Sequence, residues 1–129
     1  MKLISLLSPY VLALILTLII EGVLCLLIKQ SKAWLKFTCL VNLFTNPLVN
    51  ALYTMIYHYL AQHSLPEAAP WFLLILEITV WLSEAWLFYR FSLTRDNEQN
   101  KPVSSIYKAL LFSLVLNATT YLTGLLLQL

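Results

Sequence analysis

Four long apolar stretches dominate this sequence and leave little room for anything else. They cover residues 3–28, 33–60, 71–91 and 106–127, and each reaches the roughly 20 residues that a helix needs to cross the hydrocarbon of a bilayer. Of the 129 residues, 60% are hydrophobic and only 11% are charged, a balance unlike that of soluble domains. We therefore predict an all-α polytopic membrane protein, in which residues 1–129 form a single domain, a four-helix transmembrane bundle.

The basic residues lie in the connections and predict an orientation. Three lysines lie around the turn after the first stretch, and Lys and Arg recur after the third, whereas the connection over residues 61–70 has neither. Lys and Arg concentrate in cytoplasmic loops, so we expect the first and third connections in the cytoplasm and both termini outside. The net charge of +2 is too small to indicate a nucleic-acid partner.

The connections also carry structural signals. Pro66 and Pro70 bracket a short segment, which predicts that one helix ends and the next begins there. The connection over residues 92–105 is polar, and we expect it to be mobile. Aromatic side chains gather near the expected membrane boundaries, among them Trp34 and Phe88; this placement favours interfacial anchoring.

Glutamates and asparagines inside the apolar stretches are the candidate functional residues. A carboxylate in hydrocarbon must be paired, hydrated, protonated or bound to a cation. Counting about 1.5 Å per residue from the basic ends places one polar residue of each helix at a similar depth, with two others deeper. The layer consists of Glu21, Asn42, Glu84 and Asn117, and the deeper pair is Asn46 and Glu77. These six are the predicted cation-binding or proton-relay residues.

Helical spacing gives each stretch one polar face. Glu77 and Glu84 are seven residues apart, which is nearly two turns, so both point to the same side. We expect the four polar faces to turn toward a common interior. Further polar residues on these faces are secondary candidates: Thr45, Asn50, Ser113 and Thr120.

The sequence Thr45-Asn46-Pro47 lies within the second stretch. Proline has no amide hydrogen, so the carbonyl of Leu43 loses its usual helical partner and the helix is expected to kink. Two outcomes remain open. The freed carbonyl could act as an oxygen ligand, or the Thr45 hydroxyl or a water molecule could satisfy it.

The candidate residues supply carboxylate, amide and hydroxyl oxygens, which suit a hard cation such as Mg²⁺, Ca²⁺, Mn²⁺ or Na⁺. The same glutamates would hold such a metal. Proton binding competes closely, because no Lys or Arg lies at the depth of the glutamates to balance several charged carboxylates. We expect the lipid bilayer as the environment, and either a homo-oligomer or a larger membrane complex, since four helices enclose little space for a pathway.

Two alternatives to a cation-binding protein remain. One is a non-catalytic accessory or assembly subunit of a larger membrane complex, whose polar faces bind partner helices. The other is an intramembrane hydrolase in which paired carboxylates activate water. The sequence has neither a His-Glu-x-x-His run nor a Gly-rich phosphate loop, so an enzymatic role is the less favoured hypothesis.

A combination of these residues resembles small bacterial four-helix integral membrane proteins, a group without an assigned activity. The resemblance rests on Glu21, the segment from Asn42 to Pro47, Glu77, Glu84, the Tyr89-Arg90 pair, Ser113, Asn117 and Gly124. It covers nearly the whole chain and implies a bacterial inner membrane as the location. It supports the choice of candidate residues and implies no particular activity.

Overall fold

Helices make up nearly all of the computed structural model, which describes residues 2–27, 30–99 and 101–127. Over these residues the elements are α1 (Lys2–Leu27), α2 (Lys32–Gln62), the short 3-10 helix η1 (Pro66–Ala68), α3 (Ala69–Leu93) and α4 (Ile106–Leu127). No strand occurs in that part of the chain, so the predicted all-α fold with four helices is confirmed. Each helix boundary lies within two residues of its predicted position.

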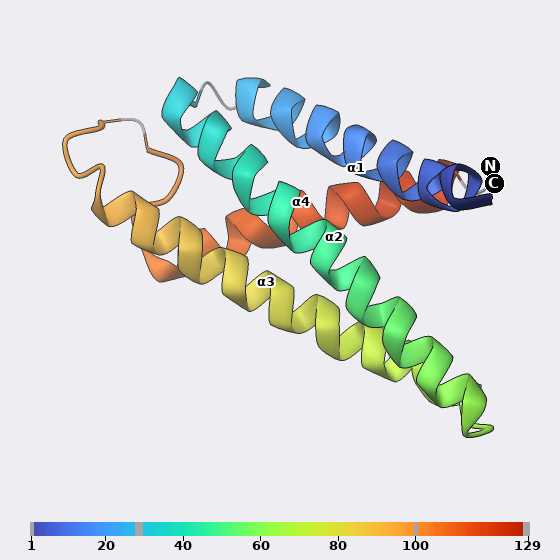
Figure 1. Ribbon diagram of the computed structural model, residues 1–129. Helices are drawn as coiled ribbons and strands as arrows, with labels where there is room; N and C mark the ends of the chain where they lie inside the picture. The colour runs from blue at the N-terminus through green and yellow to red at the C-terminus, as the bar shows by residue number, and fades with distance from the viewer. Residues whose placement is uncertain (1, 28–29, 100, 128–129) are drawn as a thin grey trace.

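The helices form a bundle that is closed at one end and splayed at the other. Helix α1 packs on α2 and α4, and α3 packs on the same two helices. All four converge at the end where α1 ends and α2 begins and where α3 ends and α4 begins, which we call the closed end (Figure 1). From there the α2–α3 hairpin diverges from α1 and α4 (Figure 1). The two termini lie at the splayed end.

An aromatic core fills the closed end. Trp34 and Phe88 are 0% exposed, and the ring of Trp34 meets the edge of Phe91 with centroids 4.9 Å apart. Phe88 packs in the same way on Phe112, at 5.0 Å. The prediction that Trp34 and Phe88 anchor the chain at a membrane interface is therefore wrong. Both face into the bundle because α2, α3 and α4 converge around them.

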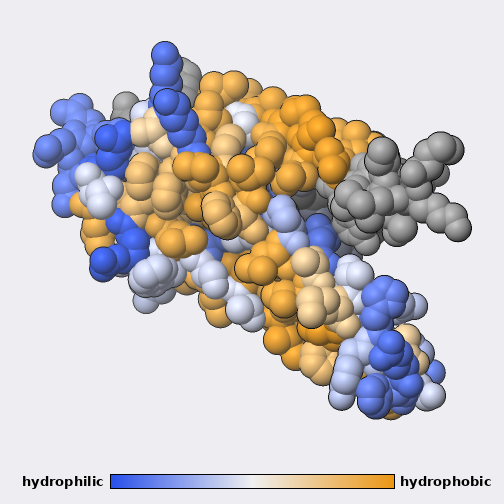
Figure 2. Space-filling model, in the orientation of Figure 1, coloured by the Kyte–Doolittle hydropathy of each residue, from blue (hydrophilic) through white to orange (hydrophobic). Residues whose placement is uncertain are grey.

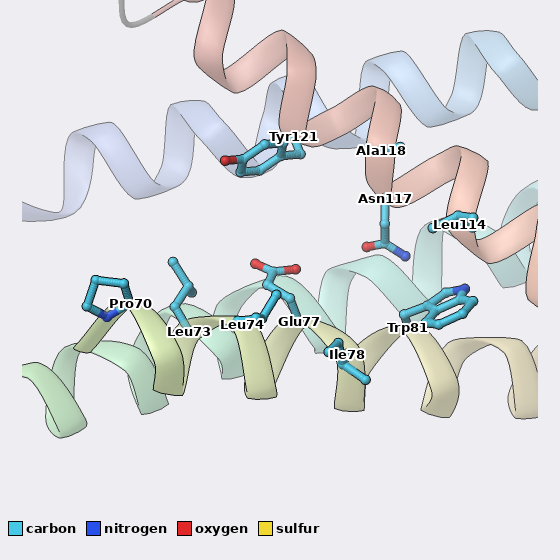
Figure 3. A pocket seen from close by; sticks show the side chains of 10 residues that line it. All are labelled: Pro70, Leu73, Leu74, Glu77, Ile78, Trp81, Leu114, Asn117, Ala118 and Tyr121. Carbon is cyan, nitrogen blue, oxygen red and sulfur yellow. The ribbon is translucent and has the colours of Figure 1, made fainter. Parts of the chain in front are cut away.

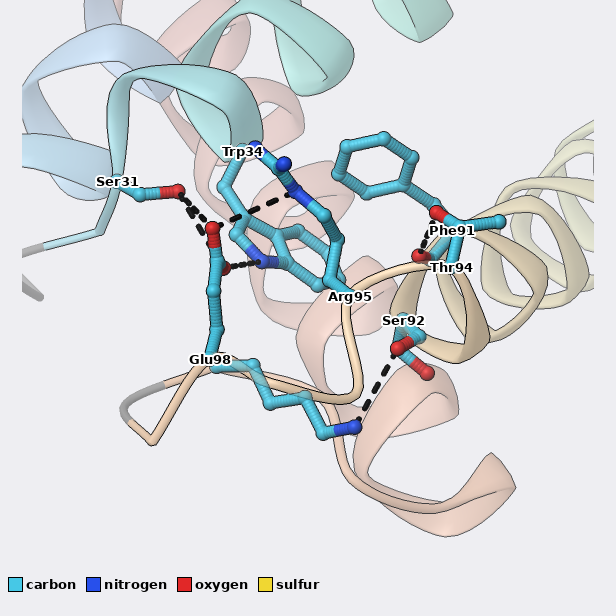
Figure 4. A network of polar contacts seen from close by, with 8 residues as sticks. Ser31, Trp34, Phe91, Ser92, Thr94, Arg95 and Glu98 are labelled. Atoms are coloured by element: carbon cyan, nitrogen blue, oxygen red, sulfur yellow. Dashed lines mark hydrogen bonds and ion pairs between the residues drawn. The ribbon is translucent and has the colours of Figure 1, made fainter.

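The connection between α3 and α4 is tethered to the α1–α2 turn, unlike the mobile loop that we expected. The Glu98 carboxylate accepts hydrogen bonds from Trp34 Nε1 at 3.0 Å and Ser31 Oγ at 3.2 Å, and it pairs with Arg95 at 3.3 Å (Figure 4). Lys101 Nζ donates to the Ser92 carbonyl oxygen at 3.3 Å and so fastens the other limb of the loop. We call the contacts of Glu98 with Ser31 and Trp34 the Glu98 latch.

Prolines mark the boundary between two helices at the outer connection, whereas Pro47 lies inside a continuous helix. Pro66 opens η1 and Pro70 lies in the first turn of α3, which confirms the predicted boundary. Helix α2 continues through Pro47. The Thr45 hydroxyl bonds the Val41 carbonyl oxygen at 3.0 Å, so it does not satisfy the carbonyl of Leu43.

Large apolar side chains cover the outside of the bundle. Leu27 is 72% exposed, Phe44 77% and Leu111 62%. Figure 2 shows an apolar surface between a hydrophilic closed end and a hydrophilic tip on the α2–α3 hairpin. Two helical segments, Lys32–Gln62 and Pro66–Leu93, are long and apolar enough to cross a membrane.

Candidate functional site

The carboxylate of Glu84 is the centre of a polar cluster inside the bundle. Its side chain is 1% exposed and receives hydrogen bonds from two neighbouring helices. Thr45 Oγ1 of α2 donates to Oε1 at 2.7 Å, and Ser113 Oγ of α4 donates to Oε2 at 3.1 Å. Asn117 Nδ2, one turn further along α4, also donates to Oε2. We call these four residues the Glu84 cluster.

All three partners of Glu84 are able to donate, an arrangement that suits an ionised carboxylate. Asn117 has two amide hydrogens, and its Nδ2 also lies 2.9 Å from the Ser113 carbonyl oxygen. The Thr45 hydroxyl has one hydrogen, so it can donate either to Glu84 or to the Val41 carbonyl oxygen at any one time. The Ser113 hydroxyl likewise has one hydrogen, which it can donate either to Glu84 or to the Trp81 carbonyl oxygen. The hydroxyl contacts of the cluster to α2 and to α4 are therefore both adjustable.

Hydrogen bonds beside the cluster fasten α3 to α4. Trp81 Nε1 donates to the Leu110 carbonyl oxygen at 2.9 Å, and Ser113 Oγ lies 3.3 Å from the Trp81 carbonyl oxygen. In the described part of the chain, both ion pairs lie in the loop of the closed end. Glu84 is therefore surrounded by hydrogen-bond donors and has no Lys or Arg partner there.

Glu77 lies two turns before Glu84 on α3, but its side chain is exposed, so the expectation that it faces the interior together with Glu84 is wrong. Its side chain points across to α4, into a partly open pocket of about 550 Å³ (Figure 3). Among the residues that the structure describes, no side chain forms a hydrogen bond or ion pair with its carboxylate. The pocket is lined by Pro70, Leu73, Leu74, Glu77, Ile78, Trp81, Leu114, Asn117, Ala118 and Tyr121.

Asn117 connects the buried cluster with the pocket. Its Nδ2 donates to Glu84, and its side chain also lines the pocket that contains Glu77. In Figure 3 the amide reaches from α4 toward α3, with its oxygen on the side of Glu77. The bond to Glu84 thus fixes which end of the amide faces the pocket.

The other predicted residues lie outside these contacts. Glu21 on α1 and Asn42 on α2 are each 1% exposed. Asn42 Nδ2 donates to the Thr38 carbonyl oxygen of its own helix at 3.1 Å, while the hydrogen bonds of the Glu84 cluster involve only α2, α3 and α4. Asn46 is half-buried, and its Nδ2 has no hydrogen-bond partner in the described part of the chain. Asn50 is exposed.

The structure gives two of the secondary candidates a central place. Thr45 and Ser113 bind Glu84 directly, whereas the side chain of Thr120 lies outside those described. Trp81 was not predicted as a site residue. It is four residues after Glu77 and three before Glu84, so helical spacing alone would have placed it on the same face.

Clusters of typical metal ligands are not found in the described residues, where no three His, Cys, Asp or Glu side chains gather closely enough to hold a metal ion. Comparisons with known proteins find no matching family model, no matching curated protein and no matching solved structure. The resemblance to small bacterial four-helix membrane proteins therefore stays a prediction.

Proposed function

We propose that the chain is an integral membrane protein in which α1 to α4 cross the bilayer. The exposed apolar side chains on the helices support this, because such a surface is stable when lipid covers it. The inward direction of the Glu84 cluster supports it as well, since polar groups in membrane helices bond one another inside the bundle. The basic connections favour a cytoplasmic closed end, with both termini and the α2–α3 connection outside.

Labelling of single introduced cysteines tests this orientation. Glu67 lies in the α2–α3 connection and Asn97 in the α3–α4 connection, and both are exposed. In intact cells, the Glu67→Cys variant is expected to react with a membrane-impermeant maleimide, whereas the Asn97→Cys variant reacts only after the membrane is opened. The unsubstituted chain, with Cys25 buried and Cys39 half-buried, gives the background. The reverse pattern contradicts the orientation, and equal labelling of both contradicts the membrane-spanning arrangement.

We further propose that the protein binds a cation at Glu77. The contrast between two carboxylates on one face of α3 supports this proposal. Glu84 is buried among three donors, whereas Glu77 is exposed and its carboxylate faces a largely apolar, partly open pocket without one. A carboxylate in such a place needs a proton or another cation to neutralise it. Glu77 is therefore the exchangeable group, and Glu84 is the fixed one.

The charge and the oxygens of the pocket favour a monovalent cation. Glu77 supplies one negative charge, and the lining includes no second acidic residue. The amide oxygen of Asn117, on the same side of the pocket (Figure 3), is a second oxygen for the bound ion. In this arrangement Glu84 acts through Asn117, by holding the amide nitrogen away from the cation.

Carbodiimide labelling tests the exchangeable role of Glu77. Dicyclohexylcarbodiimide is apolar and adds to protonated carboxyl groups, so we expect a single adduct on Glu77 in the protein purified in dodecyl maltoside. Raising the pH, or adding a monovalent cation that occupies the pocket, is expected to slow the reaction, because both remove the proton from Glu77. Peptide mass spectrometry locates the adduct and gives its rate.

The Glu77→Gln variant is expected to lose the adduct, whereas Glu67→Gln, in the exposed α2–α3 connection, should keep it. An adduct on Glu21 or Glu84 in place of Glu77 would overturn the assignment. A rate that is unaffected by pH and by Na⁺, K⁺ and organic ammonium ions alike would overturn the cation site.

A further inference from the structure

We infer that the pocket between α3 and α4 binds a lipophilic organic ammonium ion that carries one positive charge. This inference rests on the proposed cation site at Glu77 and names the class of cation. It is carried by the size of the pocket, the character of its walls and the position of the single carboxylate.

The pocket is large for an inorganic ion and poor in ligands for one. Its volume of about 550 Å³ falls within the range of roughly 300–1,000 Å³ typical of sites for small organic molecules. A hard metal ion takes about six or more oxygen ligands. The lining offers the carboxylate of Glu77, the amide oxygen of Asn117 and the hydroxyl of Tyr121. An ion that carries its own apolar groups needs no such shell.

The walls match a cation of this kind. Aliphatic side chains of both helices line the pocket and can cover alkyl groups: Leu73, Leu74, Ile78 and Leu114. Trp81 and Tyr121 add aromatic rings, whose faces attract ammonium groups. Figure 3 shows the Tyr121 ring across the pocket from the Glu77 carboxylate and the Trp81 ring further along α3. Because the Trp81 N–H is held by the Leu110 carbonyl oxygen at 2.9 Å, its ring has a fixed position.

Charge complementarity with the pocket determines the sign and the number of charges on the ligand. The lining contains one carboxylate and no Lys, Arg or His, so a monocation leaves the pocket neutral. An anion would meet Glu77 without any compensating group, and a neutral molecule would bury the carboxylate without a partner. The ammonium group therefore lies at Glu77, with its organic substituents toward the aliphatic and aromatic walls.

The route into the pocket is also apolar. The lining extends from Pro70, in the first turn of α3, to Trp81, three turns further along the helix. In the proposed orientation this places the pocket in the outer half of the bilayer. Since the pocket is partly open, a cation that dissolves at the outer lipid surface can reach Glu77 from the side.

Isothermal titration calorimetry with benzyltributylammonium chloride tests this inference. The protein is kept in dodecyl maltoside micelles, which contain neither charge nor amine. We expect saturable binding of one cation per chain, with a dissociation constant about tenfold higher or more in the Glu77→Gln variant. The Glu67→Gln variant, altered outside the pocket, is the matched control and should bind as the unsubstituted protein does. A second experiment uses benzyltrimethylammonium, a smaller ion, whose neutral isostere is neopentylbenzene. Neopentylbenzene should not compete with benzyltrimethylammonium for the pocket.

Different failures identify different errors. Equal binding to the unsubstituted protein and to Glu77→Gln would show partition into the micelle and overturn the inference. Protection of Glu77 from carbodiimide by Na⁺ or K⁺, without ammonium binding, would overturn the organic cation and leave the proposed cation site standing. Tighter binding of dihexanoylphosphatidylethanolamine than of the ammonium probe would assign the pocket to a lipid headgroup and overturn the inference as well.

Discussion

Replacing Glu84 with alanine is expected to lower the free energy of unfolding by about 2–3 kcal/mol. The substitution removes the common acceptor of three donors on α2 and α4. These donors then stay in the bundle without that acceptor. Hydrogen bonds between membrane helices contribute on average about 0.6 kcal/mol each, and the cost of donors left unsatisfied adds to that sum. Thermal unfolding in dodecyl maltoside measures the loss, with the buried thiol of Cys25 reporting exposure to a maleimide dye.

Two variants separate the role of Glu84 from general damage to α3. Glu84→Gln keeps the shape and one acceptor oxygen, so a smaller loss is expected. Glu77→Gln, on the same face but without donors to lose, should change stability by less than about 0.5 kcal/mol.

The effects of Glu84→Ala and Asn117→Ala on the free energy of unfolding should be less than additive in the double variant, because both substitutions break the same bond. A fully stable Glu84→Ala protein would contradict the cluster.

Replacing Trp34 with alanine is expected to cost about 3–5 kcal/mol, the range for large aromatic side chains in a core. The indole is 0% exposed and contacts the rings of Phe91 and Phe112. Its Nε1 also donates to Glu98 in the latch. We expect the Trp34→Ala protein to unfold at the lowest temperature of all the variants described, in the same maleimide assay.

The Trp34→Phe variant isolates the hydrogen bond of the latch. It keeps an aromatic ring in the core and removes the N–H. The free energy of unfolding is expected to fall by about 1 kcal/mol, which includes the lost hydrogen bond and some loss of packing. Trp86→Ala is the control for tryptophan removal, because that side chain is 57% exposed and should change stability far less. A loss for Trp86→Ala as large as for Trp34→Ala would contradict the position of Trp34 in the core.

Depth along the helices and the inward direction of most polar side chains could be predicted from the sequence, while their hydrogen-bond partners could not. Counting from the basic ends placed Glu84 and Asn117 at one level, and the structure joins them. Glu21 and Asn42 have the same predicted depth. The Asn42 amide nevertheless donates to its own helix at Thr38, because the tilt and rotation of each helix follow from packing that no single apolar stretch encodes.

The closed end was the least predictable part. Trp34 and Phe88 have the composition and position of interfacial anchors, and only the convergence of three helices makes them a core. Similarly, the polar loop around Glu98 looks solvated when considered alone. The Glu98 carboxylate accepts hydrogen bonds from Ser31 and Trp34, which are 67 and 64 residues away in the sequence. Local sequence patterns carry no information on contacts between residues so far apart.

The splayed shape of the bundle has a mechanical consequence at Glu84. This residue lies in the second half of α3, and its bonds reach α2 on one side and α4 on the other. Glu84 lies 14 positions after Pro70, which makes a lever arm of about 21 Å. A tilt of α3 by about 10° around this fulcrum would displace its outer tip by about 4 Å. In the proposed membrane-spanning protein with a cation at Glu77, small adjustments around that cation would be magnified at the outer end of α3.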